Sequence, residues 1–282
     1  MSTPLSTPVS TPLRPAPAAG APKQSRPPLV LLVLAAAGVL LFLVPLVGLV
    51  AAAPWRTLGS RLATRVVVDA AVLSLVSSVA AAAVAAVVGI PLAWVLARVE
   101  FPGRSVVRSL VLLPMVLPPV VGGTALLFAL GRRGVVGGPL HDATGLLLPY
   151  SLWGVVLANA FVATPLLVLS LEGALRSLDD RYEAAARTMG ARPLRVFVRV
   201  TLPLLAPALV GALAIAWARA LGEFGATVTF AGNLQGRTQT LPLAVFVALE
   251  SDRDTAVAVS LVLVALSLGV LVALRRRWWP AP

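Results

Sequence analysis

The stretch DDRYEAAARTMGARPLRVFVRVTLP, residues 179–203, lies in the longest charged interval between two apolar spans of this chain. Arginines stand in or beside it at positions 176, 181, 187, 192, 195 and 199. Because charged side chains are costly in the hydrocarbon of a bilayer, a basic segment of this length is expected outside the membrane. We therefore predict that it is a contact surface for a partner on one side of that membrane.

Composition places the chain among integral membrane proteins. Of its 282 residues, 59% are hydrophobic and only 12% are charged, whereas about 25% of the residues of a soluble domain are charged. The net charge of +12 comes from loops between apolar spans. The sequence lacks the basic face interleaved with aromatic residues that would indicate nucleic-acid binding. The chain has no cysteine and one histidine, which excludes cysteine-based metal sites and a disulfide framework.

Lysine content bears on ATP hydrolysis. The only lysine is Lys23, near the amino terminus. The phosphate-binding loop of ATPases requires Gly-Lys-Ser or Gly-Lys-Thr, so this chain cannot form one. We expect no catalytic residues, no metal site and no cofactor bound by the chain itself.

Apolar stretches long enough to cross a bilayer as helices lie at residues 29–53, 70–97, 109–130, 150–171, 201–221 and 255–274. They predict an all-α integral membrane protein with six transmembrane helices. Residues 1–28 repeat Ser-Thr-Pro and predict a disordered tail, so the transmembrane domain would be 29–282. The first stretch is longer than the roughly 7–15 residues of a signal-peptide core, which favours an uncleaved helix.

The third stretch predicts an interrupted helix. It contains three prolines between positions 114 and 119, followed by Gly122, Gly123 and Thr124. Irregular backbone inside a membrane is tolerated where it is buried in protein or lines a cavity. We therefore expect this stretch to face a translocation path, with a packing kink against a neighbouring helix as the alternative.

Orientation follows from the basic residues. Six spans place both termini on one side, which would then hold Arg14, Lys23, Arg26, Arg98, Arg104, Arg108, the arginines of the charged interval and Arg275 to Arg277. The positive-inside rule predicts that this side is the cytoplasm. Arg56, Arg61 and Arg65 would lie on the opposite side and do not fit this prediction.

The charged interval predicts two short helices joined by a glycine turn. An aspartate at 179 or 180 is expected to cap the first helix, with Glu183 at the spacing of a capping box. Gly190 is expected to end that helix and Pro193 to begin the next. The alanines at 184–186 form a small-residue face that can enter a groove on a partner.

The order Glu183-Ala184-Ala185, Gly190 and Leu202-Pro203 resembles the EAA motif of the membrane subunits of bacterial ABC importers. The resemblance covers roughly residues 58–276 and implies the transmembrane domain of a type I importer. It also implies that residues 176–200, hereafter the EAA loop, dock onto a cytoplasmic ATPase dimer that uses ATP and Mg. The residues to which it assigns ATPase coupling are Glu183, Ala184, Ala185, Gly190, Ala191, Leu202 and Pro203.

Other segments resemble the molybdate-permease branch of this family, namely FPGR at 101–104, LPMVLPPVVGG at 113–123, FVATPLLV at 161–168 and ARALGEFGATVTFAGNLQGRTQTLPLAVFVALE at 218–250. They imply a molybdate permease of the bacterial inner membrane, with an external oxyanion-binding protein and a second, identical permease subunit. Sulfate, thiosulfate or tungstate permeases are the alternatives within the family. An ion-coupled secondary transporter would be expected to carry carboxylates in its spans, and an assembly protein would not need the EAA spacing.

In such a permease the oxyanion path needs hydrogen-bond donors, but these must bind the anion weakly enough for it to leave again. The candidates are Gly122, Gly123 and Thr124 in the third stretch, with Arg219, Glu223, Thr227 and Thr229 at the end of the fifth. Arg219 and Glu223 are four residues apart and can pair on one helical face. Their pair is either structural or part of a gate.

Overall fold

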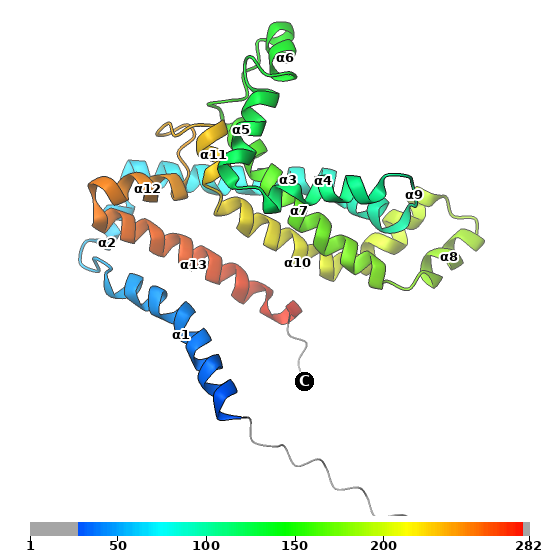
Figure 1. The fold of residues 1–282 in the computed structure, drawn as a ribbon, viewed down its shortest axis with the longest axis horizontal. Coiled ribbons are helices and arrows are strands. Elements are labelled where there is room, and N and C mark those ends of the chain that lie inside the picture. The colour runs from blue at the N-terminus through cyan, green and yellow to red at the C-terminus, as the bar shows by residue number, and fades with distance from the viewer. Residues whose placement is uncertain (1–27, 279–282) are drawn as a thin grey trace, which may run out of the picture. The chain divides into compact units, whose positions relative to one another are not determined.

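The computed structural model describes residues 28–278, and all the regular structure in that range is helical, which confirms the all-α prediction (Figure 1). Among these residues, five helices are long and apolar enough to cross a membrane, or six when one bent pair counts as a single span. This agrees with the six spans expected. The Pro-rich tail predicted at 1–28 lies, except for Pro28, outside the described residues.

The helices are α1 (Leu29–Ala51), α2 (Leu58–Leu62), α3 (Arg65–Arg98), α4 (Arg104–Val116), α5 (Pro119–Leu130), α6 (Gly137–Thr144), α7 (Leu152–Ser177), α8 (Arg181–Thr188), α9 (Pro193–Val196), the π-helix η1 (Phe197–Thr201), α10 (Leu202–Leu221), α11 (Gly225–Phe230), α12 (Leu241–Ser251) and α13 (Arg253–Trp278). The chain divides into two units inside α1, between Val47 and Gly48. The elements from α2 onward belong to the second unit.

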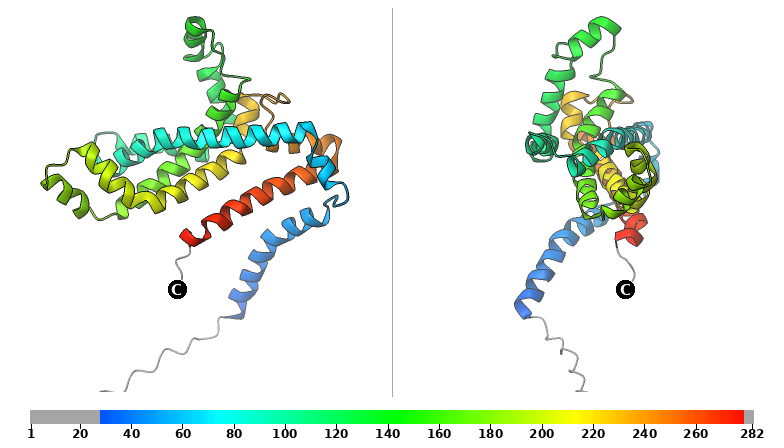
Figure 2. Two further views of the ribbon diagram at one scale, coloured as in Figure 1. Left: turned by 180° about the vertical axis from the view of Figure 1, so that it is seen from behind. Right: turned by 90° about the vertical axis from the view of Figure 1, so that its right-hand side faces the viewer.

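Helices α3, α7 and α10 lie side by side and form the core of the second unit (Figures 1 and 2). The face of α3 toward α7 carries small residues, among them Ala81 and Ala85, which are fully buried. A Cβ placed on Gly89 would lie 2.7 Å from Cδ2 of Leu167 on α7. The small side chains thus let the two backbones approach closely, as expected for helices packed in lipid.

Several helices continue beyond the apolar stretches that predict them. Residues 54–69, which join the first two apolar stretches, contain α2 and the first turn of α3. Arg65 lies 3.8 Å from Asp69 one turn later, and such a pair supports a helical turn in water. Hydropathy identifies the apolar part of a helix and misses a charged end of this kind.

The third predicted span is broken, as expected from its prolines. The chain bends by 118° between helices α4 and α5. Leu117 is extended, with φ −65° and ψ 139°, because a residue before proline avoids the α region. Pro118 and Pro119 then begin α5, where the missing N–H groups need no intrahelical partner. The α5–α6 segment consequently stands apart from α4 in both views of Figure 2.

An ion-pair network joins α2 to the corner between α12 and α13. Arg61 contacts Asp252 at 2.6 Å and Asp254 at 3.0 Å, and it donates a hydrogen bond to the hydroxyl of Thr255. Asp252 also accepts hydrogen bonds from the hydroxyl and the backbone N–H of Thr255. Two arginines that did not fit the charge prediction, Arg61 and Arg65, are therefore paired with aspartates on their own side.

Asp252 gives the corner a testable pH dependence. The Thr255 hydroxyl and backbone N–H, and then Arg61, hold the pKa of Asp252 below its ordinary value of 3.8. The pKa of Asp252 is lower in the folded than in the unfolded protein. The network therefore contributes its full stabilisation of the fold at pH values above the unfolded-state pKa, and this contribution is lost as the pH falls through the folded-state pKa.

We expect Asp252→Asn to lower the thermal midpoint of the purified protein at neutral pH. The difference from the wild type should disappear in acid, where Asp252 of the wild type is protonated. Thermal unfolding in detergent as a function of pH measures this difference. A constant difference between the two proteins at every pH would contradict the assignment.

Candidate functional site

The EAA loop contains the predicted helix–turn–helix. Helix α8 begins after Asp180, and the side chain of Asp179 accepts a hydrogen bond of 2.9 Å from the backbone N–H of Arg181. The helix ends at Thr188, and Gly190 has φ +80°, a conformation that glycine adopts without steric strain. The prediction that Gly190 stops this helix is confirmed. Pro193 begins α9, also as predicted.

Glu183 points into the protein and does not cap the helix. It is 2% exposed, and its carboxylate accepts hydrogen bonds from Arg187 at 2.9 Å and from the Thr201 hydroxyl at 2.8 Å. The capping-box prediction for Glu183 is therefore wrong. A buried carboxylate needs compensating partners, and Arg187 and Thr201 satisfy it better than the helix terminus could.

Arg98, the last residue of α3, ties the EAA loop to the helix core. Its guanidinium lies 3.7 Å from Oε1 of Glu183 and forms a further ion pair with Asp180. It also reaches the carbonyl of Leu178 at 3.5 Å. With 14% of its side chain exposed, Arg98 is largely shielded from water, so its pairs are screened less than surface pairs.

The opposite face of the EAA loop is open. Ala184, Ala185 and Gly190 are exposed and Ala191 is partly exposed. Large apolar side chains beside them are exposed as well, namely Tyr182, Met189 and Leu194. Contiguous apolar surface of this kind indicates a site of protein contact, and small alanines leave room for a partner's atoms.

Leu202 and Pro203 lie where the EAA loop joins the fifth span. Pro193 to Leu221 form one continuous helical segment that passes through η1, so the span does not begin at Thr201 as a separate element. The N–H of Leu202 bonds to the carbonyl of Phe197 in π-helical register. Pro203, the next residue, has no N–H to donate. Thr201, the last residue of the π turn, is buried and its hydroxyl donates a hydrogen bond to Glu183.

The second group of candidates lies where α5 meets α11. A Cβ placed on Gly123 would be 2.8 Å from the carbonyl oxygen of Ala226, and one placed on Gly122 would be 3.0 Å from the ring of Phe161. Both glycines are buried. Thr124 is partly exposed and bonds to the Val120 carbonyl. In this structure Gly122 and Gly123 therefore permit close packing against Phe161 and α11.

Arg219 and Glu223 form the expected pair, 2.6 Å apart. Glu223 is fully buried, and its other oxygen accepts a hydrogen bond of 2.7 Å from the N–H of Ala226 at the start of α11. Arg219 keeps 34% of its side chain exposed. The pair thus fixes the turn between α10 and α11, and the arginine side chain stays partly accessible.

The two threonines differ. Thr227 is fully buried and donates a hydrogen bond of 3.1 Å to Asn159 on α7, so it joins α11 to the core and is closed to an anion in this structure. Thr229 is partly exposed and bonds to the carbonyl of Gly225.

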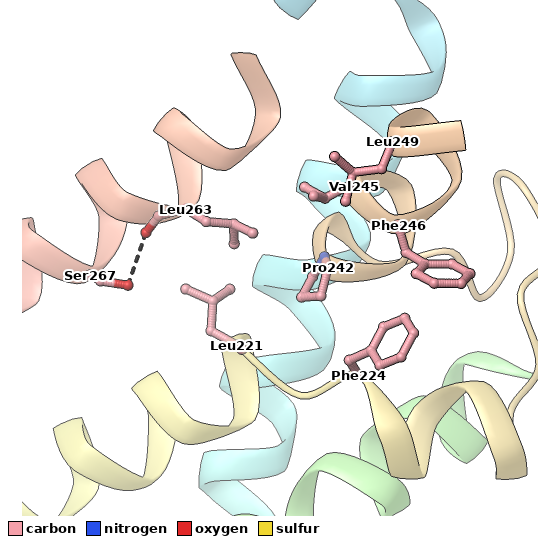
Figure 3. A pocket seen from close by; sticks show the side chains of 9 residues that line it. Leu221, Phe224, Pro242, Val245, Phe246, Leu249, Leu263 and Ser267 are labelled. Atoms are coloured by element: carbon pink, nitrogen blue, oxygen red, sulfur yellow. Dashed lines mark hydrogen bonds between the residues drawn. The ribbon is translucent and has the colours of Figure 1, made fainter. Parts of the chain in front are cut away.

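An apolar cavity of about 370 Å³ lies beside the Arg219–Glu223 turn. Figure 3 shows Leu221 and Phe224 facing Pro242, Phe246 and Leu263 across it. The rings of Phe224 and Phe246 are 5.2 Å apart. Among the described residues, no charged side chain lines this cavity.

The structure therefore separates the sequence candidates into two groups. The EAA-loop residues lie at one end of α3, α7 and α10, and the α5–α11 residues lie away from that end (Figure 1). Within residues 28–278, no three His, Asp or Glu side chains gather in a way that could hold a metal ion.

Comparison with known proteins identifies the family. Residues 85–278 match the binding-protein-dependent transport system inner membrane components. The chain belongs to this family. It is accordingly a multi-pass membrane protein and a non-catalytic transmembrane subunit of an ABC transporter.

Individual relatives refine the comparison. The chain is 46% identical to the molybdenum transport system permease protein ModB of Mycobacterium tuberculosis over 245 residues, covering 86% of this chain and 92% of that protein. It is 36% identical to the sulfate transport system permease protein CysT of Escherichia coli, covering 83% and 86%. The crystal structure of a bacterial alginate ABC transporter contains a chain with the same fold, with a TM-score of 0.70, 18% identity and coverage of 87% and 92%.

Sequence reasoning missed several side chains that organise this permease. Arg98 and Thr201 hold Glu183, and Asn159 holds Thr227. Glu172, near the end of α7, is fully buried between arginines. A carboxylate or amide within or next to an apolar stretch is the signal that could have identified Glu172 and Asn159.

We expect Gly123→Ala to destabilise the permease, by about 1–3 kcal/mol if the neighbouring backbone holds its place, because the new methyl group would meet α11. Gly173→Ala is the matched control, since a Cβ at this exposed helical position meets nothing within 4 Å. The control should be neutral or slightly stabilising. Thermal unfolding of the two purified variants measures the contrast, and equal midpoints would argue against close α5–α11 contact.

Proposed function

We propose that this chain is the permease subunit of an ATP-driven molybdate importer. The observation that carries the substrate is the 46% identity to the molybdenum permease ModB, which exceeds the 36% identity to the sulfate permease CysT. Both relatives are covered along most of their length, so the difference does not come from a short shared segment. Tungstate and sulfate are tetrahedral dianions like molybdate, and they remain the alternative substrates.

The arrangement of partners follows from the family and from the two faces of the EAA loop. In this proposal, both termini and the EAA loop are cytoplasmic, as the positive-inside rule favours. The open face of the loop docks onto an ATPase dimer, which binds ATP and Mg. An external binding protein delivers the anion, and a second copy of this chain completes the path.

The contacts of the EAA loop support different roles for its residues. Ala184, Ala185, Gly190 and Ala191 would meet the ATPase, because they lie on or beside the open face. Glu183 is buried, so it would act as a positioning residue that holds the loop on Arg98 and Thr201. Leu202 and Pro203 would carry movement of the loop into α10, through the π turn that precedes them.

The proposed path residues also divide by exposure. Arg219, Thr124 and Thr229 keep some exposure and would offer donors to the anion. Gly122, Gly123, Glu223 and Thr227 would shape the path by holding α11 against α5 and α7. Because a path must also release its ligand, a few separate donors suit it better than a closed cage.

Ala185→Arg tests the docking face. The substitution adds a bulky cation at an exposed position and leaves the internal contacts of the EAA loop unchanged. We expect the permease to reach normal levels in the membrane but to lose its ATPase during affinity purification, with uptake reduced at least about tenfold, as a loss of about 1.4 kcal/mol in binding would produce. Full retention of the ATPase together with normal uptake would refute the proposed docking.

Uptake by the complete complex in proteoliposomes tests the substrate. Labelled molybdate is supplied at a concentration that loads the binding protein. Unlabelled tungstate should then compete with it for uptake, because the two anions match in size and charge. A large excess of sulfate should leave uptake nearly unchanged. The same complex without ATP serves as the control for leakage. Strong competition by sulfate, or labelled sulfate uptake at the same rate, would transfer the assignment to the sulfate branch.

A further inference from the structure

Glu172 is a buried carboxylate whose position is explained neither by ATPase docking at the EAA loop nor by anion binding in the path. It lies on α7, one turn before Arg176 and within the last turns of that helix, and its side chain is 1% exposed. Burying a charge is unfavourable unless it is paired. The position therefore has to be understood from its partners.

Two arginines flank this carboxylate from different elements. Arg176, on the same helix, donates a hydrogen bond of 2.6 Å to Oε1. Arg108 belongs to α4, and its Nε lies 3.1 Å from Oε2. One cation therefore belongs to α7 itself, and the other joins α7 to a second helix.

The helix reached by Arg108 is the first half of the broken span. Helix α4 runs from Arg104 to Val116 and turns through 118° into α5, whose glycines pack against α11. Val107 and Val111 of α4 also pack on the core cluster, which contains residues of α7. Arg108–Glu172 is the ion pair between α4 and α7 among the described residues.

The packing between α4 and α7 is incomplete near this contact. An apolar hollow of about 340 Å³ lies under α4, lined by Leu110, Val111 and Pro114 of α4 and by Phe161 and Thr164 of α7. The facing atoms, Nε of Arg108 and Oε2 of Glu172, are buried and lack an aligned hydrogen bond. Their contact is close in distance but not optimised in direction, so a shift of α4 can tighten or loosen it.

We propose that Arg108 and Glu172 are positioning residues that transmit movement of the EAA loop, through the end of α7, to the broken helix α4–α5. The inference rests on the proposed ATPase docking at the EAA loop. Helix α7 leads directly into that loop through Leu178, and α4 leads into the α5–α11 contact. The ion pair therefore connects the docking end to the region of the proposed path.

The matched pair of variants Arg108→Gln and Arg176→Gln tests this role. Each removes one cation from the same carboxylate, and both arginines are roughly 40% exposed, so the loss of charge is similar. Only Arg108 joins α7 to another helix. A purely electrostatic role in accommodating Glu172 would make the two variants behave alike.

The measurement is molybdate uptake per ATP hydrolysed by the complete complex in proteoliposomes, with ATPase co-purification recorded in parallel. We expect both variants to retain the ATPase. Arg108→Gln should lower uptake per ATP at least about fivefold, a ratio that corresponds to about 1 kcal/mol. Arg176→Gln, at the first position of the EAA loop and still within helix α7, should lower it clearly less.

The outcomes separate this inference from the proposed function. Equal uptake per ATP in Arg108→Gln and the wild type, or equal losses in both single variants, would overturn the transmission role while leaving ATPase docking intact. Failure of the wild-type chain to retain an ATPase would instead overturn the proposed function itself. If Arg108→Gln does not assemble and Arg176→Gln does, the pair is a folding contact and the transmission role is rejected.

Discussion

The buried carboxylate of Glu183 is the interaction on which the organisation of this permease depends. An acidic side chain with 2% exposure is tolerated only with compensating donors. It obtains them from Arg187 of its own helix, from Thr201 at the π turn and from the nearby guanidinium of Arg98. Of these partners, Arg98 stands at the end of α3 and Thr201 at the start of the fifth span. Pairing Glu183 therefore fixes the EAA loop on the core and leaves the alanine face of α8 toward the outside.

The same physical constraint recurs at Glu172 and Glu223. Each is a fully buried carboxylate with an arginine four residues away on the chain and a further contact to another part of the structure. The local arginine offsets the charge, and the second contact determines which element the carboxylate holds. For Glu172 that element is α4, and for Glu223 it is the start of α11. Three acidic side chains thus connect the loop, the broken helix and the α5–α11 contact.

Much of the fold could be predicted from the sequence. The six apolar stretches, the break at Pro118 and Pro119, the helix stop at Gly190 and the pairing of Arg219 with Glu223 all depend on residues close in sequence. The failures involve partners from distant segments. Glu183 stood at the spacing of a capping box, yet Thr201 and Arg187 take its oxygens. Gly122 and Gly123 stood in an interrupted helix, and only the structure shows that they pack against Phe161 and α11.

By itself, the sequence determined that this is a helical membrane protein, because a bilayer offers the backbone no water and long apolar segments must satisfy their own hydrogen bonds. The order of Glu183, Ala184, Ala185, Gly190 and Leu202-Pro203 is likewise a property of the chain alone. Only the tertiary structure decided which of these residues face inward. The direction of a buried charge depends on where its counter-charges lie in space, and Arg98 and Arg108 reach Glu183 and Glu172 only after α3 and α4 pack against the EAA loop and α7.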